Sequence, residues 1–153
     1  MAEYDLVIRN TTIATAADVV KGDIGGSGGR VVALGEQLDR GRREIDATGL
    51  IAVPGGIDAH VHFDQDPADG SGFCDDFESG SRAAAAGGTT TIIPFAYQNK
   101  GQPLRDAVNK YHQRAAGKSL IDYAFHVILS DASDKIMGQD FTALVADGYT
   151  SFK

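Results

Sequence analysis

The residue pattern of this chain changes at Pro54, and that change constrains the fold more than any other feature. Before Pro54, short β-prone runs such as 4–8 are separated by turn residues. The glycine cluster at 25–29 precedes the apolar run 30–35, a spacing typical of a β-hairpin with a long turn. We therefore expect residues 1–54 to form an all-β unit.

After Pro54 the pattern alternates between β-prone and helical segments. Residues 57–62 form a short run that predicts a strand. Asp75 is a candidate N-cap with Glu78 three residues later, as in a capping box, and the helix that it begins should stop at Gly87. The further predicted elements are strands at 89–93, 121–129 and 149–152, a helix that begins near Pro103 and a helix around Phe141.

The order of these elements, β-α-β-α-β-α-β, predicts an α/β fold with parallel strands and right-handed crossovers. Both an open doubly wound sheet and a closed (β/α)8 barrel accept this order. A dinucleotide-binding sheet would need its glycines between a strand and a helix, whereas the cluster 25–29 lies in the β-rich region. A barrel needs eight strands over typically about 250 residues. Because this chain of 153 residues reaches only the fourth, we expect it to be a fragment of a longer protein.

Composition and charge exclude several classes of partner. The 14 Lys and Arg against 21 Asp and Glu give a formal net charge of −7, which opposes attraction to nucleic acid or to an anionic membrane. The single cysteine, Cys74, cannot form an intrachain disulfide and fits a reducing compartment. No apolar run approaches the roughly 20 residues that span a bilayer, and residues 1–5 carry no positive signal-peptide region. The expected location is therefore the cytoplasm.

His60 and His62 are the strongest local signal for chemistry. In a strand, side chains two residues apart point to the same face, so both imidazoles can converge on one point. Barrel enzymes place their sites at the carboxyl ends of strands, where this pair lies. Neutral imidazole is a common zinc ligand, and a metal held in this way can activate water. A His-x-His pair also arises by chance, so the spacing alone does not decide between a metal site and two unrelated histidines.

Several segments, in order along the chain, resemble one known family. Residues 54–62, Pro-Gly-Gly-Ile-Asp-Ala-His-Val-His, resemble the opening motif of the cyclic amidohydrolases, and residues 75–91 and 122–126 also resemble that family. Within that superfamily they are most similar to the dihydropyrimidinase/hydantoinase branch. The final segment, 148–153, resembles the one that ends in the metal-bridging lysine of that branch. The resemblance extends along the whole chain.

The resemblance implies a metal-dependent hydrolase in which a (β/α)8 TIM barrel stands beside an accessory β-sandwich built from both chain ends. Residues 1–54 would belong to the sandwich and residues 55–153 would form the first part of the barrel. The barrel would hold two divalent metal ions, usually Zn²⁺. His60 and His62 would bind the more buried ion, and Lys153, carboxylated by carbon dioxide to N6-carboxylysine, would bridge both.

The role of Lys153 as a metal ligand rests on the resemblance alone. Judged by residue type only, a lysine is usually exposed to solvent and would be read as an ordinary surface side chain. The assigned chemistry is coherent. An ammonium cannot bind a cation, whereas a carbamate is anionic and offers two oxygens.

Other side chains are weaker candidates. Asp58 shares the strand face of His60, and we interpret it as a hydrogen-bond acceptor in the outer shell of the site rather than a ligand. Phe63, Phe95 and Phe152 follow or end strands on the expected active face, so they either line the substrate pocket or pack in the core. The resemblance associates the position of Phe152 with loops that grip the exocyclic substituent of the substrate.

Three further side chains are expected to have no part in the chemistry. We expect His126 to be a core histidine with satisfied hydrogen bonds, although it lies on a strand that could turn it into the barrel. His112 is expected on a polar, solvated helix face. Cys74 has no partner cysteine and no adjacent histidine, so it receives no catalytic role.

By resemblance, the function is the hydrolysis of a cyclic amide, with a hydantoin or 5,6-dihydropyrimidine ring opened to an N-carbamoyl amino acid by a metal-bridging hydroxide. The remaining histidine ligands and the catalytic Asp would lie downstream of Lys153, so no catalytic residue is assigned within this chain. Val61 and Pro94 stand where many relatives have Thr and Asp. These departures leave the substrate subtype open.

Three alternatives remain. Allantoinase and dihydroorotase are related cyclic amidases, and the second would need cations for the substrate carboxylate, whereas Arg82 and Arg105 are expected on helices away from the histidines. A non-catalytic dihydropyrimidinase-related scaffold is the third alternative, and the presence of both histidines and of Lys153 argues against it. The expected partners are a small cyclic amide and, by resemblance, further copies of the protein in a homotetramer.

Overall fold

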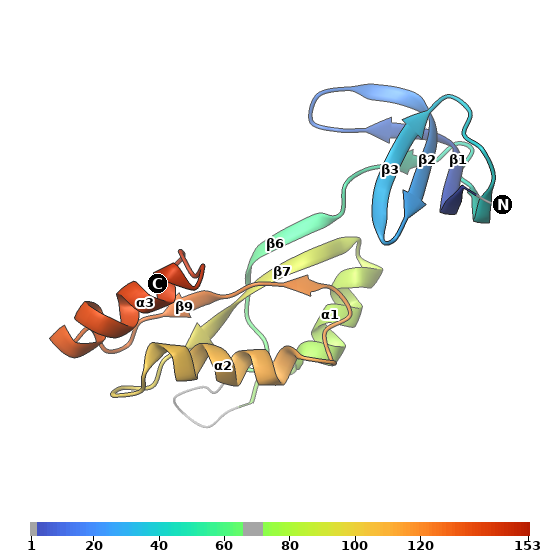
Figure 1. The fold of residues 1–153 in the computed structure, drawn as a ribbon. Helices are drawn as coiled ribbons and strands as arrows, with labels where there is room; N and C mark the ends of the chain where they lie inside the picture. The colour runs from blue at the N-terminus through green and yellow to red at the C-terminus, as the bar shows by residue number, and fades with distance from the viewer. Residues whose placement is uncertain (1–2, 66–71) are drawn as a thin grey trace. The chain divides into compact units, whose positions relative to one another are not determined.

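The computed structural model describes residues 3–65 and 72–153, and it divides the chain into two compact units, Met1–Pro54 and Gly55–Lys153. Among the described residues, the first unit contains strands alone, and the second alternates strands with helices (Figure 1). This organisation confirms the predicted mixed α/β class, while the (β/α)8 barrel and the β-sandwich stay predictions.

A five-stranded sheet makes up the first unit. Its strand order is β3 (Arg30–Gly35), β2 (Val19–Ser27), β1 (Tyr4–Ala14) and β4 (Gly41–Asp46), with β5 (Ile51–Ala52) also paired to β1. Strands β2 and β3 form the predicted antiparallel hairpin, and Gly28 and Gly29 turn the chain at positive φ. Strand β1 pairs antiparallel with β2 and in parallel with β4.

The buried carboxylate of Asp23 cross-links the first unit. Its Oδ1 accepts the backbone N–H of Asn10 at 2.9 Å, and its Oδ2 accepts the N–H of Leu38 at 3.1 Å and the Arg9 guanidinium at 2.7 Å. Burial raises the pKa of Asp23, but these three donors lower it by more, so the pKa lies below its usual value. The ionised side chain therefore connects β1, β2 and the segment that follows β3.

The apolar side chains of the first unit are mostly exposed. Among its described residues, the buried hydrophobic side chains are Val7, Ile13 and Ala47. Its exposed large hydrophobic residues are Val19, Val20, Val31, Val32, Leu34, Ile45, Leu50, Ile51 and Val53. Within the part of the chain that the structure describes, this sheet leaves much apolar surface in contact with water.

Parallel strands joined by helices make up the second unit. Strand β6 (Gly56–Val61) pairs with β7 (Thr89–Tyr97), which pairs in turn with β8 (Asp122–Tyr123) and β9 (His126–Ile128). Helix α1 (Phe77–Ala86) joins β6 to β7, α2 (Leu104–Ala115) joins β7 to β8, and a π-helical turn, η1 (Ile136–Phe141), continues into α3 (Thr142–Ala146). Helices α1 and α2 lie on the same side of the strands (Figure 1).

An apolar core fills the space between these strands and helices. Phe77 of α1 is 0% exposed and Ile92 of β7 is 1% exposed. The helix predicted to begin near Pro103 is confirmed as α2, and its apolar stripe is buried: Leu104, Val108, Tyr111 and Ala115. Helix α1 stops where predicted, with Gly87 as its C-cap and Gly88 at positive φ.

Two details differ from the sequence prediction. The N-cap of α1 is Asp76 rather than Asp75, and its carboxylate and backbone N–H exchange hydrogen bonds with Ser79, so serine replaces the expected Glu78 in the capping box. The strand predicted at 121–129 is split into β8 and β9. Phe95 pairs with His126, so the residue before it, Pro94, lies at the gap and has no N–H to donate to the ladder.

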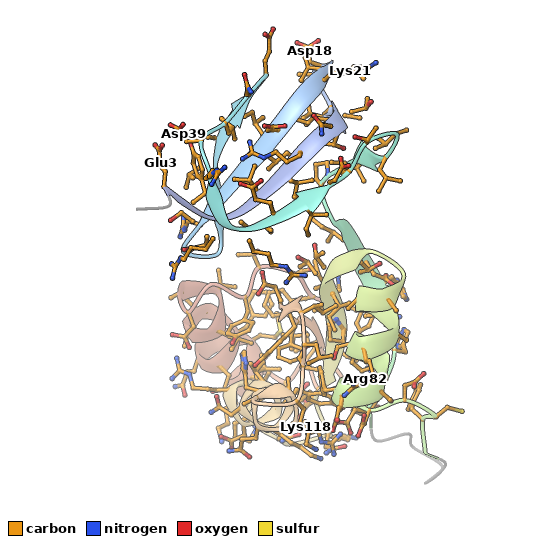
Figure 2. The ribbon with its side chains drawn as sticks, turned by 90° about the vertical axis from the view of Figure 1, so that its right-hand side faces the viewer. Glu3, Asp18, Lys21, Asp39, Arg82 and Lys118 are labelled. Atoms are coloured by element: carbon orange, nitrogen blue, oxygen red, sulfur yellow. The ribbon has the colours of Figure 1, made fainter. Side chains whose placement is uncertain are left out.

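Charged side chains lie at the surface of both units. Asp18 and Lys21 are exposed in the first, and Arg82 and Lys118 in the second (Figure 2). None of the helices in the described ranges is long and apolar enough to span a bilayer.

Candidate metal centre

His60 and His62 lie at the carboxyl end of β6, and their imidazoles face each other. The two Nε2 atoms are 3.2 Å apart. Two nitrogen ligands at about 2.05 Å from one tetrahedral zinc ion would lie about 3.3 Å apart. The separation therefore suits two ligands of a single ion.

Gln65 fixes the orientation and the tautomer of His62. Its Oε1 lies 2.7 Å from Nδ1 of His62, and its Nε2 donates to the carbonyl of Phe95 at 2.8 Å. Because an amide oxygen only accepts hydrogen bonds, Nδ1 of His62 carries the proton and Nε2 has the free lone pair. This is the tautomer that a metal ligand at Nε2 needs. Gln65 could not be predicted from the sequence, because its spacing from His62 matches no recognisable motif.

The ring of Phe95 connects the histidines with the end of the chain. His62 stacks on this ring with centroids 4.6 Å apart and planes inclined by 11°, and His60 meets it edge-on at 4.8 Å. The Nζ atom of Lys153 lies 4.7 Å from the centroid of the same ring, in cation–π contact. The three residues predicted as metal ligands therefore gather around one buried aromatic side chain.

Asp58 supports the backbone beside the histidines. Its Oδ1 accepts the backbone N–H of His60 at 3.0 Å. The pairing of β6 with β7 shifts register between Asp58 and Val61, so the carboxylate satisfies a donor at an irregularity of the ladder. The side chain contacts the backbone of His60.

The other two aromatic candidates pack away from the histidines. Phe63 is 4% exposed and its ring lies 5.1 Å from that of Phe77 in the core. Of the two alternatives for Phe63, the structure therefore favours core packing. Phe152 is half-buried and packs on Phe141, with ring centroids 4.4 Å apart. Of the three predicted pocket residues, Phe95 is the one that contacts the histidines.

His126 has both ring nitrogens within hydrogen-bond distance of partners, as expected for a satisfied histidine. Its Nε2 lies 2.8 Å from the carbonyl oxygen of Ala59, and its Nδ1 lies 2.6 Å from Oγ of Ser151. Its ring also packs at 5.1 Å from Phe95.

The expectation that His112 is solvated is wrong. The imidazole is half-buried, 4.9 Å from the ring of Phe125, and its Nε2 lies 2.6 Å from the hydroxyl of Tyr149. Burial lowers the pKa of His112. Burial, together with the charge of Asp147, raises the pKa of Tyr149. The face of α2 that looks polar in the sequence is covered by the segment that follows α3.

The described donors form an incomplete set. Within residues 3–65 and 72–153, no three side chains among His, Cys, Asp and Glu come together as a metal site. Two imidazoles with aligned Nε2 atoms fit zinc, which takes nitrogen, sulfur and oxygen ligands. A protonated lysine offers no lone pair, so Lys153 would contribute only as its carbamate.

Comparison with known proteins identifies the group to which the chain is related. The model of the amidohydrolase family matches residues 51–142. A D-hydantoinase from Geobacillus stearothermophilus is 45% identical over 148 residues, which cover 96% of this chain and 31% of that protein. A D-phenylhydantoinase from Escherichia coli K12 is 38% identical over 151 residues, with coverages of 97% and 32%. The chain spans about a third of the length of these relatives.

Solved structures agree with this relationship. One D-hydantoinase structure matches with a TM-score of 0.91 and 39% identity, covering 97% of this chain and 32% of that one. The dihydropyrimidinase from Brevibacillus agri gives a TM-score of 0.88 and 41% identity, with coverages of 95% and 32%. The L-hydantoinase from Arthrobacter aurescens, at 24% identity and a TM-score of 0.78, shows the shared fold alone, again over 97% of this chain and 32% of that one. The resemblance to the hydantoinase branch is confirmed, and the chain belongs to the amidohydrolase family.

Proposed function

We propose that this chain works in a cyclic amidohydrolase that opens hydantoin or 5,6-dihydropyrimidine rings to N-carbamoyl amino acids. The observation that carries the proposal is the pair of Nε2 atoms of His60 and His62, 3.2 Å apart at the carboxyl end of β6. The substrate class comes from similar proteins, which are named D-hydantoinase and dihydropyrimidinase.

In this proposal His60 and His62 would hold one divalent ion, Zn²⁺, and Lys153, as N6-carboxylysine, would be shared between it and a second ion. The position of Lys153 supports the assignment, because its Nζ lies over the ring that both imidazoles contact. When bound, two such ions activate water and polarise the carbonyl of the ring.

The residues of this chain prepare the site in three ways. Gln65 keeps the proton of His62 on Nδ1, so that Nε2 faces the ion. Phe95 supplies an apolar floor against which both imidazoles pack. Asp58 holds the backbone of His60 through its N–H. We assign the remaining histidine ligands and the Asp that transfers the proton to sequence outside this chain.

The proposal includes the architecture that the resemblance implies. Strands β6, β7, β8 and β9 would begin a (β/α)8 barrel over residues 55–153, which the parallel pairing and the intervening helices support. Residues 1–54 would form one layer of a β-sandwich. The exposed apolar side chains of this sheet support that assignment, because a sheet needs a second layer to bury such a face.

The alternatives have less support. For dihydroorotase, Arg82 and Arg105 are the cations considered, but Arg82 pairs with Glu78 and Arg105 pairs with Asp147. A non-catalytic scaffold would not need two imidazoles whose Nε2 atoms lie at the spacing of two ligands of one ion. The homotetramer and the cytoplasmic location stay predictions from the resemblance and from composition.

Ring opening of hydantoin, dihydrouracil, allantoin and dihydroorotate by the full-length protein tests the proposal, before and after chelation and return of zinc. We expect turnover of the first two, its loss with chelator and its recovery with zinc. His62→Ala should abolish this activity, whereas Arg82→Ala on the exposed face of α1 should retain it. If protein shown to hold two metals opened none of these rings, the substrate class would be wrong. Inactive protein without bound metal would favour the scaffold.

A further inference from the structure

The backbone of β6 leaves its ladder just where the histidines begin. Asp58 pairs with Ile92 and Val61 with Pro94, so three steps along β6 correspond to two along β7. This is the geometry of a β-bulge, which redirects side chains but frees backbone groups from the sheet. Backbone groups freed in this way bond to side chains or to water instead.

Side chains satisfy two backbone groups at this bulge. The N–H of His60 donates to Asp58, as described above. The carbonyl oxygen of Ala59 lies 2.8 Å from Nε2 of His126. Because a carbonyl only accepts, Nε2 of His126 carries a proton. The histidine of β9 therefore reaches the residue immediately before His60.

The second nitrogen of His126 reaches the other part of the site. Its Nδ1 lies 2.6 Å from Oγ of Ser151. In the neutral ring that nitrogen accepts, so the serine hydroxyl donates to it. Ser151 and Lys153 flank Phe152 in an extended segment, with the Ser151 carbonyl accepting from Val127 and the Lys153 N–H donating back to Val127. Side chains two residues apart in such a segment point to the same side.

We propose that His126 is a positioning residue of the metal centre, holding the bulge that carries His60 in register with the segment that carries Lys153. The imidazole of His126 spans the two segments through its two nitrogens. The ring of Phe95, which His60, His62 and Lys153 also contact, packs beside it. The inference rests on the proposed function, since it concerns the placement of the ligands assigned there. His126 itself binds no metal, because both of its nitrogens are occupied.

Substitutions that keep one hydrogen bond at a time separate positioning from packing. In His126→Gln the amide nitrogen replaces Nε2 and retains the bond to Ala59, while the bond to Ser151 is lost. In His126→Asn the amide oxygen replaces Nδ1 and retains the bond to Ser151. His126→Leu removes both. These variants of the full-length protein are compared for zinc affinity by chelator competition, for lysine carboxylation by carbon-13 NMR with labelled bicarbonate, and for thermal unfolding without metal.

We expect His126→Leu to weaken zinc binding about tenfold, the effect typical of losing a group that orients metal ligands, and to reduce carboxylation of Lys153. The Gln and Asn variants should each recover part of the loss. Ser151→Ala should match His126→Gln and should cost little more when added to it, because both remove the same bond. His112→Gln is the control, since His112 contacts neither Ala59 nor Ser151, and its zinc affinity should equal that of the wild type.

Wild-type zinc affinity in His126→Leu would overturn the inference. So would equal losses of thermal stability in all His126 variants without a graded change in zinc affinity, because that pattern belongs to core packing. If His126→Leu does not fold, the Gln and Asn variants and the Ser151 cycle decide. A wild-type protein that binds no zinc would instead refute the proposed function itself, and the two failures are thereby distinguished.

Discussion

The two units of this chain are stabilised by different means. The first is a sheet whose described interior contains few buried hydrophobic side chains, and its strands are tied by charged and polar groups around Asp23. The second has a continuous apolar core between parallel strands and helices. The candidate metal ligands all belong to the second unit, where they surround the ring of Phe95 on β7.

This difference indicates which unit can hold functional side chains in fixed positions. A close-packed core fixes the elements that contribute to it, and β7, which adds Ile92 and Ala96 to the core, also carries Phe95. The ring of Phe95 in turn contacts His60, His62 and Lys153. In the first unit the large exposed apolar residues make no such framework. Three substitutions and a change of pH test that contrast, in order of decreasing effect.

Removing the centre of the apolar core should have the largest effect. Phe77 is 0% exposed and its ring contacts those of Phe63, Tyr123 and Phe125. Phe77→Ala should lower the free energy of unfolding by about 4 kcal/mol, measured by denaturant titration of the full-length protein. Arg82→Ala on the same helix removes only an exposed ion pair and should change little. Equal stability of the two variants would refute the assignment of this core.

Removing the polar cross-link should lower the stability of the first unit by a somewhat smaller amount. Asp23→Ala leaves the N–H groups of Asn10 and Leu38 and the Arg9 guanidinium without their acceptor. We expect a loss of about 3 kcal/mol, seen as faster hydrogen exchange within residues 3–54, with zinc binding unchanged. Asp18→Ala, at an exposed position, is the control. An Asp23 variant as stable as this control would contradict the contrast between the units.

The third substitution acts on the site alone. Gln65→Met removes the acceptor of the His62 Nδ1–H, so we expect zinc affinity to fall about tenfold, which corresponds to about 1.4 kcal/mol. Gln65→Glu keeps an acceptor oxygen and should bind zinc more tightly than the Met variant. Chelator competition measures both affinities. A Met variant that binds zinc as tightly as the wild type would show that Gln65 has no role in orienting His62.

Acidification should destabilise the two units at different pH values. Near neutral pH we expect this effect to be the smallest of the four. The folded pKa of Asp23 lies below its usual value, so its contribution to stability is complete above about pH 4 and is lost as the pH falls through the folded pKa. Amide protection factors, which are corrected for the intrinsic exchange rate at each pH, should therefore fall in the first unit before the second below about pH 4. Asp23→Ala should reduce this difference. Earlier loss of protection in the second unit would contradict the account.

Local chemistry explains which parts of the fold were predictable. The stripe on α2 and the glycines that end α1 act through neighbouring residues, so the sequence pattern predicts them. The N-cap was misplaced because Asp75 and Asp76 both offer a carboxylate at the start of the same helix. The gap between β8 and β9 lies near Pro94 because of the register in which both strands pair with β7. No local sequence pattern reveals that register.

The candidate site was predictable to a similar degree. The convergence of His60 and His62 follows from the two-residue period of a strand, whereas Lys153 was proposed only from the resemblance to a family. The roles of Gln65 and His126 depend on the path of a loop and on a bulge in β6, so tertiary structure was needed to find them. The burial of His112 likewise depends on a segment distant in sequence.

The most direct test is a crystal structure of the full-length protein with zinc, using anomalous scattering at the zinc edge. The account predicts a zinc ion at about 2.0–2.1 Å from Nε2 of both His60 and His62, with a carboxyl group on Nζ of Lys153 bridging to a second ion. Zinc bound elsewhere, or these two imidazoles still bonded to each other beside an unmodified Lys153, would contradict it.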